Sequence, residues 1–130
     1  LEGALKLKEL AYVHAEGYPA GEMKHGPLAL IEEGMPVVVI APRDEHYKKT
    51  ISNMQEVISR GAKVLLITNK STDEIYSENI WEQIEVDVIS DELIPFLTTI
   101  PLQKLAYYSA LDKGYDIDKP RNLAKSVTVE

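Results

Sequence analysis

Cysteine is absent from this sequence of 130 residues. The chain can therefore form neither a disulfide nor a metal site built on thiolates, and the absence favours a reducing, cytoplasmic environment. The three histidines, His14, His25 and His46, do not have the spacing of metal ligands. Glycine-rich nucleotide-binding motifs are also missing. We therefore expect no metal ion and no other cofactor.

Positive charge and long apolar runs are scarce as well. Acidic residues outnumber basic ones by 21 to 14, which gives a formal net charge of −7. This balance argues against nonspecific binding of nucleic acid, because such binding requires a positive field. The most apolar stretch, from Leu93 to Leu102, has about ten residues, against the roughly 20 that span a bilayer. No basic segment followed by an apolar one opens the chain, so we expect neither a signal peptide nor a membrane span.

What the sequence does contain is an alternation of helix-favouring and β-branched segments. Helices are expected over residues 1–16, 28–31, 45–60 and 91–113. Strands are expected over residues 36–42 and 63–68 and within residues 80–89. The first two strand segments are continuous apolar runs, which are typical of strands buried on both faces. The alternation predicts an α/β domain with a parallel sheet.

The two ends of the chain differ in character. Leu1 is not a methionine, and no capping residue precedes the helical segment that it opens. Three strands also make a thin sheet, so we expect a domain that is truncated at its N-terminus. The residues after Gly114 show no clear periodicity. We therefore expect one domain over residues 1–114 and a separate tail over residues 115–130.

One face of the first expected helix carries charge. At 100° per residue, Glu2, Lys6, Glu9 and Val13 lie within about 60° of one another, and Glu16 joins them if the helix extends that far. Apolar residues flank this stripe on both sides, so we expect a mostly buried helix. A lysine beside a glutamate in a cleft can transfer protons, because each group tunes the pKa of the other. The alternative is a solvent-exposed set of ion pairs.

His25 and Lys125 are two further candidates. His25 lies in a segment rich in glycine and proline, where rigid neighbours suit general acid–base catalysis near neutral pH. The alternative is a hydrogen-bonded surface histidine. Lys125 lies close to the end of the sequence, and a lysine amine can form a Schiff base with a sugar carbonyl when its pKa is lowered. The alternative there is a solvated lysine in a tail.

The sequence also resembles a known family. The resemblance rests on three segments: LEGALKLKE (residues 1–9), KHGPLALI (24–31) and PRNLAKSVTVE (120–130). All three are similar to the glutamine–fructose-6-phosphate aminotransferases (isomerizing), the glucosamine-6-phosphate synthases, from inside their second sugar-isomerase (SIS) domain to their C-terminus. The segment KHGPLALI is moderately specific, because other SIS proteins carry similar loops. The terminal segment is highly specific when it follows that loop.

The resemblance implies a fold, a reaction and residue roles. The fold is a three-layer α/β/α domain of the SIS type, which is flavodoxin-like. The reaction converts fructose 6-phosphate into glucosamine 6-phosphate for hexosamine biosynthesis, with ammonia from glutamine. In the family, the residue matching Lys125 forms a Schiff base with the open-chain sugar, and the one matching Glu9 moves a proton between its first two carbons. Lys125 and Glu9 would thus bind substrate, Lys6 would handle a proton near the first hydroxyl, and His25, from the neighbouring subunit of a homodimer, would open the sugar ring.

The resemblance also implies that parts of the family enzyme lie outside this sequence. The glutaminase cysteine cannot be present, since the chain has none, and the serine- and threonine-rich phosphate loop belongs to the first SIS domain. We therefore expect the 130 residues alone to be inactive and to bind fructose 6-phosphate poorly. Two alternatives stay open: a noncatalytic SIS module that binds phosphosugars, and a related SIS isomerase or deglycase without a glutaminase half. A tail that carries Lys125 distinguishes the enzyme from the noncatalytic module.

Overall fold

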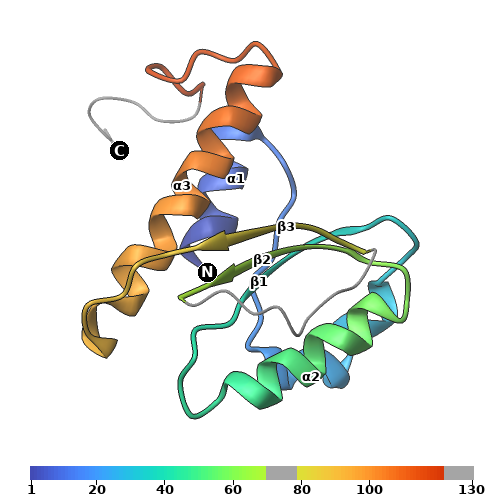
Figure 1. The fold of residues 1–130 in the computed structure, drawn as a ribbon. Coiled ribbons are helices and arrows are strands. Elements are labelled where there is room, and N and C mark those ends of the chain that lie inside the picture. Colours follow the sequence, from blue (N-terminus) through green and yellow to red (C-terminus); the bar gives the residue numbers. More distant parts are fainter. Residues whose placement is uncertain (70–78, 122–130) are drawn as a thin grey trace, which may run out of the picture. The chain divides into compact units, whose positions relative to one another are not determined.

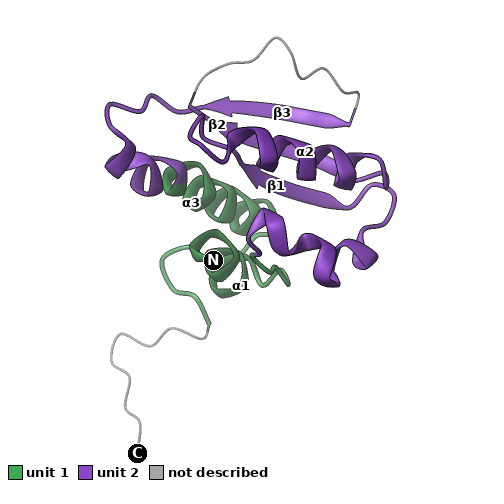
Figure 2. Ribbon diagram, turned by 90° about the horizontal axis from the view of Figure 1, so that it is seen from below, with its two compact units in different colours: residues 1–17, 99–130 green, residues 18–98 purple. Residues whose placement is uncertain are grey.

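The structure is a computed structural model that describes residues 1–69 and 79–121. The chain divides into two compact units, which Figure 2 shows in different colours. Unit 1 consists of residues 1–17 and 99–130, and unit 2 consists of residues 18–98. The division into a domain over residues 1–114 and a tail over residues 115–130 stays a prediction.

The unit of residues 18–98 is built on a parallel sheet with the strand order β1-β2-β3 (Figure 1). The strands are β1 (Pro36–Ile40), β2 (Lys63–Thr68) and β3 (Ile80–Glu85). The predicted α/β class and the parallel sheet are confirmed. The third strand is shorter than the predicted segment, because Glu85 pairs with Thr68, and β2 ends at that residue.

Helix α2 (Tyr47–Ile58) covers one face of this sheet. Its apolar residues recur at helical spacing, as at Ile51 and Met54, and so form one apolar face. The buried core between this face and the sheet contains Ala41, Met54, Val57, Ala62, Val64 and Leu66. The turn after α2 requires a glycine, because Gly61 has a φ of 89° and a Cβ there would clash with Glu33.

The two most apolar strands differ in burial. In β2, the neighbouring residues Leu66 and Ile67 point to opposite faces of the sheet, and both are fully buried. In β1, Val38 and Ile40 are 36% and 40% exposed. The prediction of a strand buried on both faces is therefore right for β2 and wrong for β1. The reason is position: β1 lies at the edge of the described sheet, and an apolar run does not reveal which strand has neighbours on both sides.

Unit 1 pairs two helices. They are α1 (Glu2–Ala11) and the part of α3 (Ile94–Asp112) that follows Thr98. The helices lie side by side (Figure 1), and a Cβ added to Gly3 would lie only 2.8 Å from Cδ1 of Leu102. The backbone of α1 therefore approaches α3 more closely than any residue with a side chain at position 3 would allow.

Helix α1 ends at Ala11, five residues before the predicted limit. Tyr12 adopts a left-handed conformation with a φ of 52°. The backbone N–H groups of Tyr12 and Val13 then both donate to the carbonyl of Leu7, which closes the helix end. Glycine normally marks such an end, and its absence from this position is why the sequence indicated a longer helix.

Three short 3-10 helices occur where the sequence predicted a loop, a short helix and the start of a long helix. They are η1 (Ala20–His25), η2 (Pro27–Leu30) and η3 (Asp91–Leu93). The helix predicted over residues 28–31 is η2, and the helix predicted from residue 91 begins as η3 before α3. Gly26, with a φ of 136°, separates η1 from η2. Within residues 1–69 and 79–121, no helix is long and apolar enough to cross a bilayer.

Candidate active site

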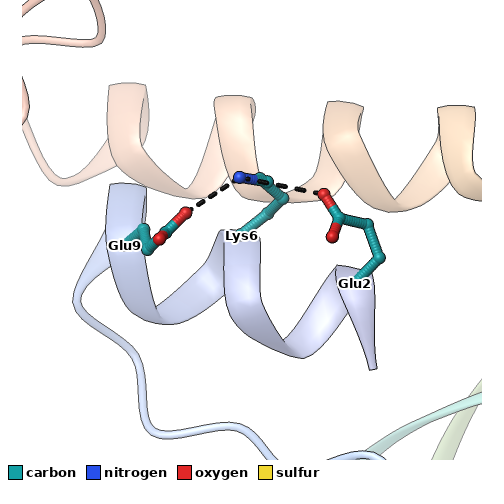
Figure 3. A network of polar contacts seen from close by, with 3 residues as sticks. All are labelled: Glu2, Lys6 and Glu9. Carbon is teal, nitrogen blue, oxygen red and sulfur yellow. Dashed lines mark hydrogen bonds and ion pairs between the residues drawn. The ribbon is translucent and has the colours of Figure 1, made fainter. Parts of the chain in front are cut away.

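Helix α1 presents three charged side chains on one face. Glu2, Lys6 and Glu9 are four and three residues apart, which places them above one another along the helix. The ammonium Nζ of Lys6 lies 2.8 Å from Oε2 of Glu9 and 3.7 Å from Oε1 of Glu2 (Figure 3). Lys6 thus donates a hydrogen bond to Glu9 and forms a weaker ion pair with Glu2.

Burial strengthens this arrangement. The side chains of Lys6 and Glu9 are 29% and 25% exposed, so solvent screens their interaction only in part. The hydrogen bond to Glu9 raises the pKa of the Lys6 ammonium, partial burial lowers it, and the charges of Glu9 and Glu2 add to the rise. The net effect is a raised pKa, so Lys6 is protonated at neutral pH. Lys6 can therefore donate a proton or stabilise negative charge, but it is a poor nucleophile.

The charged stripe is shorter and more exposed than predicted. Val13 and Glu16 do not extend it, because the helix ends at Ala11. The prediction of a mostly buried helix is also wrong, since only Gly3 and Ala11 are buried within α1. The close approach at Gly3 buries the backbone of α1, while its longer side chains keep part of their surface in solvent.

Tyr12 connects the end of α1 to the start of the tail. Its hydroxyl accepts a hydrogen bond from the backbone N–H of Arg121 at 2.8 Å. The guanidinium of Arg121 also lies 3.7 Å from the centroid of the Tyr12 ring, within the range of cation–π contacts. The ring of Tyr115 packs edge-on at 4.8 Å. Lys113 donates to the carbonyl of Ala11 at 3.2 Å, which satisfies one of the free carbonyls at the helix end.

Sequence reasoning missed this cluster. Tyr12 and Arg121 are separated by 109 residues, and no spacing rule connects residues that far apart. The one available signal was the proximity of Arg121 to Lys125, four residues later in the same segment.

His25 lies in the other unit, at the end of η1. Its Nδ1 is 2.8 Å from Oε2 of Glu22, and the two side chains are 72% and 60% exposed. Lys24, beside it, forms a 2.8 Å ion pair with Glu56 of α2, which ties η1 to that helix. His25 is therefore a solvent-exposed imidazole held by one carboxylate. The predicted loop is a short helix at this point.

Two further predictions concern Lys125 and metal binding. Lys125 lies outside the described residues. Among residues 1–69 and 79–121, no group of three or more histidines and carboxylates is placed to hold a metal ion. Of the four predicted site residues, the structure brings together Lys6 and Glu9.

Comparison with known proteins assigns the fold. The family model described as the SIS domain matches residues 1–112. The chain belongs to the SIS domain family. The predicted three-layer α/β/α fold of the SIS type is thereby confirmed, and the match ends at the last residue of α3.

The relatives of this SIS domain are aminotransferases. The chain is 55% identical over its full 130 residues to the glutamine–fructose-6-phosphate aminotransferase (isomerizing) of Brucella suis, and 56% identical to that of Aquifex aeolicus. It covers 21% and 22% of these proteins, so it spans about a fifth of their length. The resemblance read from the three sequence segments is confirmed.

Solved structures agree with this assignment. The SIS domain matches the C-terminal domain of glucosamine-fructose-6-phosphate aminotransferase from Francisella tularensis with a TM-score of 0.80 and 46% identity. That match covers 88% of this chain and 32% of the other. It also matches a glucosamine-6-phosphate deaminase from Thermotoga maritima with a TM-score of 0.74 and 31% identity, over 99% of this chain and 36% of the other.

Proposed function

We propose that this chain is the isomerase part of an enzyme that converts fructose 6-phosphate into glucosamine 6-phosphate with nitrogen from glutamine. The observation that carries the proposal is the 2.8 Å Lys6–Glu9 pair, about three-quarters buried on α1, in a chain that matches aminotransferases over its full length. The family model ends at residue 112, whereas the aminotransferases match all 130 residues. The tail that holds Lys125 is therefore part of what this chain shares with them.

Each proposed role follows from the chemistry. The amine of Lys125 attacks the C2 carbonyl of open-chain fructose 6-phosphate, and loss of water gives a Schiff base. Ammonia displaces the lysine and leaves an imine at C2. The carboxylate of Glu9 removes a proton from C1 and returns it to C2, while the C1 hydroxyl loses its proton and the nitrogen gains one. The product is a 2-amino aldose, glucosamine 6-phosphate.

The raised pKa of Lys6 fits this sequence of steps. A protonated Lys6 can stabilise the oxygen at C1 while the proton moves, because its ammonium provides a fixed positive charge. The same protonation makes Lys6 unsuitable for Schiff-base formation, which leaves that step to Lys125. Glu2, at 3.7 Å, supports the ammonium from the other side.

The direct test is to trap the Schiff base. The full-length enzyme that carries these 130 residues is treated with fructose 6-phosphate and borohydride, and the modified peptide is mapped by mass spectrometry. We expect the label on Lys125 and no turnover in Lys125→Arg. Lys119→Arg, a matched change at an exposed lysine in the same segment, should leave labelling at Lys125 intact. Turnover that survives Lys125→Arg would refute the proposal.

His25 is proposed to open the sugar ring from the neighbouring subunit of a homodimer. Complementation tests this role. Subunits with Lys125→Arg, which should be inactive alone, are mixed with subunits that carry His25→Ala, which should keep only a small residual activity alone. In a hybrid dimer one site then has both an intact lysine and an intact histidine, so random mixing should restore about a quarter of the activity. If His25 served its own subunit, no hybrid site would be intact, and mixing would give no activity above that of the His25→Ala subunits alone.

The 130 residues by themselves should not make glucosamine 6-phosphate. The phosphate-binding loop and the glutaminase cysteine implied by the resemblance lie outside them. We expect no product from the purified chain with ammonia and fructose 6-phosphate, and product formation there would contradict this expectation. We place the reaction in the cytoplasm, which the absence of cysteine supports.

A second candidate function has one observation in its favour. The solved structure named as a glucosamine-6-phosphate deaminase matches 99% of this chain. A deaminase of this kind would act on glucosamine 6-phosphate without a glutaminase half. Nitrogen-labelled glutamine distinguishes the two: label in glucosamine 6-phosphate supports the synthase, and release of unlabelled ammonia from glucosamine 6-phosphate alone supports the deaminase. A noncatalytic module would do neither.

A further inference from the structure

Helix α1 approaches α3 most closely at a residue without a side chain. A Cβ added to Gly3 would lie 2.8 Å from Cδ1, 3.0 Å from Cβ and 3.2 Å from Cδ2 of Leu102. Carbon atoms in contact prefer separations of about 3.5–4.0 Å, so a larger residue at position 3 requires the two helices to move apart by at least about 0.7 Å. Gly3 therefore sets how closely α1 packs against α3.

A second contact holds the other end of α1. The ammonium Nζ of Lys113, the residue after the end of α3, donates to the carbonyl of Ala11 at 3.2 Å. The residues that recur every three or four positions toward Lys113 form one face of α3. They are Leu102, Ala106 and Ala110, and both alanines are fully buried. Helix α1 is thus held against this face near both of its ends.

The charged pair lies between the two contacts. Lys6 and Glu9 follow Gly3 and precede Ala11 on one helix, and their 2.8 Å hydrogen bond joins residues of that helix alone (Figure 3). A displacement of α1 carries both groups together and keeps this bond. It changes their distance to a substrate that other parts of the full-length enzyme hold. The depth of α1 therefore matters for reach, and it does not matter for the pair itself.

We propose that Gly3 is a positioning residue, which seats α1 on α3 and thereby places the Glu9 carboxylate within reach of the proton at C1 of the sugar. This inference rests on the proposed proton-transfer role of Glu9. A general base has to lie within hydrogen-bond distance of the proton that it removes. A misplacement of about 1 Å by a distant change can cost about a hundredfold in rate.

The test asks whether a change on α3 reverses the effect of a change on α1. In the full-length enzyme, kcat and KM for fructose 6-phosphate are measured for Gly3→Ala, Leu102→Ala and the double variant. Glucitol 6-phosphate, which has no carbonyl and cannot react, serves as the binding probe, and glutamine hydrolysis is measured in parallel. Gly21→Ala is the matched control, because a Cβ at Gly21 would meet nothing within 4 Å.

We expect Gly3→Ala to lower kcat for isomerisation by about tenfold to a hundredfold, with little change in KM, in glucitol 6-phosphate affinity or in glutamine hydrolysis. Leu102→Ala removes Cδ1 and Cδ2 and leaves only the 3.0 Å approach to Cβ. The double variant should therefore recover most of the lost kcat, a coupling that independent defects would not show. The pH profile of kcat should keep its shape, because the Lys6–Glu9 bond moves with the helix.

Lys113→Met tests the second contact. It keeps an apolar side chain and loses the ammonium that donates to the carbonyl of Ala11. One partly buried hydrogen bond is lost, so kcat should fall by about twofold to tenfold at constant KM. Lys113→Arg keeps a charged donor and should restore kcat. Lys104→Met is the matched control, since Lys104 is another exposed lysine of α3.

The outcomes separate this inference from the proposed function. If Glu9→Gln leaves isomerisation unchanged, the proposed role of Glu9 fails first. If Glu9→Gln impairs isomerisation but Gly3→Ala keeps kcat within about twofold, Glu9 retains its role and Gly3 does not position it. A double variant no faster than Gly3→Ala, or a shifted pH profile, would also overturn the positioning role.

A general structural defect gives a different result. Equal losses in kcat, glucitol 6-phosphate affinity and glutamine hydrolysis for Gly3→Ala would overturn the inference. If Gly3→Ala does not fold, the variants of Lys113 decide. A loss of kcat in Lys113→Met that Lys113→Arg reverses would support the seating of α1, and an unchanged kcat in Lys113→Met would refute it.

Discussion

Two pairs of polar side chains in this protein have the same separation but differ in their exposure to solvent. Lys6 and Glu9 are three residues apart and 2.8 Å from each other, and so are Glu22 and His25. The first pair is about three-quarters buried, whereas the second is mostly exposed. Because water screens the exposed charges, the same distance carries less energy in the second pair. Hydrogen-bond length alone therefore does not show where a protein has prepared a site for chemistry.

The supporting structure explains the difference. Lys6 and Glu9 lie on a regular α-helix whose backbone is held close to α3 at Gly3. His25 ends a short 3-10 helix, where hydrogen-bond geometry is poorer and neighbours are few. The proton transfer proposed for Glu9 within its own subunit benefits from a side chain held on a regular helix. The role proposed for His25 in a neighbouring subunit requires an accessible side chain, and His25 is exposed.

The largest expected effect distinguishes Glu9 from Glu2, the other carboxylate beside Lys6. Glu9→Gln removes the carboxylate that is proposed to carry the proton, so isomerisation should fall by about a hundredfold to ten-thousandfold. Glutamine hydrolysis in the full-length enzyme should stay nearly unchanged. Glu2→Gln is the matched control, since Glu2 lies on the same stripe at 3.7 Å from Lys6. Product and glutamate are measured in parallel, and equal loss of both activities would argue against a local proton-transfer role.

The next effect concerns the exposed pair. His25→Ala should slow turnover of fructose 6-phosphate by about tenfold to a hundredfold, because ring opening loses its acid–base group. Glu22→Gln should slow it by less than about threefold, since an exposed pair contributes little to the imidazole. Steady-state kinetics on both variants provides the measurement. A loss from Glu22→Gln as large as that from Glu9→Gln would break the contrast between the two pairs.

A smaller effect concerns pH and stability. The folded state raises the pKa of Lys6, so it binds this proton more tightly than the unfolded chain does. The stabilisation is complete below the unfolded pKa of about 10.4 and is lost as the pH rises through the higher folded value. The free energy of unfolding should therefore differ between the protein and Lys6→Met by about 0.5 kcal/mol at pH 8, and the difference should shrink as the pH rises through the raised pKa of Lys6. Urea unfolding at several pH values measures this, and a difference that grows with pH would reverse the assigned sign.

The smallest effect is the contribution of the exposed Glu22–His25 pair to the free energy of unfolding. Glu22→Gln should change the free energy of unfolding by less than about 0.5 kcal/mol, and the change should vanish in 1 M salt. The Lys6→Met difference should persist in part at that salt concentration, because its pair is less accessible to ions. Urea unfolding at low and high salt compares the two. Equal salt sensitivity would show that burial does not distinguish the pairs.

Sequence reasoning reached those features that depend on local pattern. Helical spacing placed Lys6 beside Glu9, and the apolar run of β2 indicated a strand buried on both faces, as the structure shows. It failed where the burial of a residue or the end of a helix depends on residues that are far apart in the sequence. The exposure of Val38 depends on which strand lies at the sheet edge, and the end of α1 depends on a tyrosine that Arg121 contacts from 109 residues away. No window of neighbouring residues contains that information.

Gly3 limits how this helix can vary. A Cβ there would lie 2.8 Å from Cδ1 and 3.0 Å from Cβ of Leu102, so rotating the leucine side chain cannot make room. Any other residue at position 3 would push α1 outward and carry Lys6 and Glu9 with it. In a library randomised at position 3, glycine should therefore be the residue that active clones share, although it has no side chain. An engineer who transplants the Lys6–Glu9 stripe into another scaffold needs to move this glycine with it.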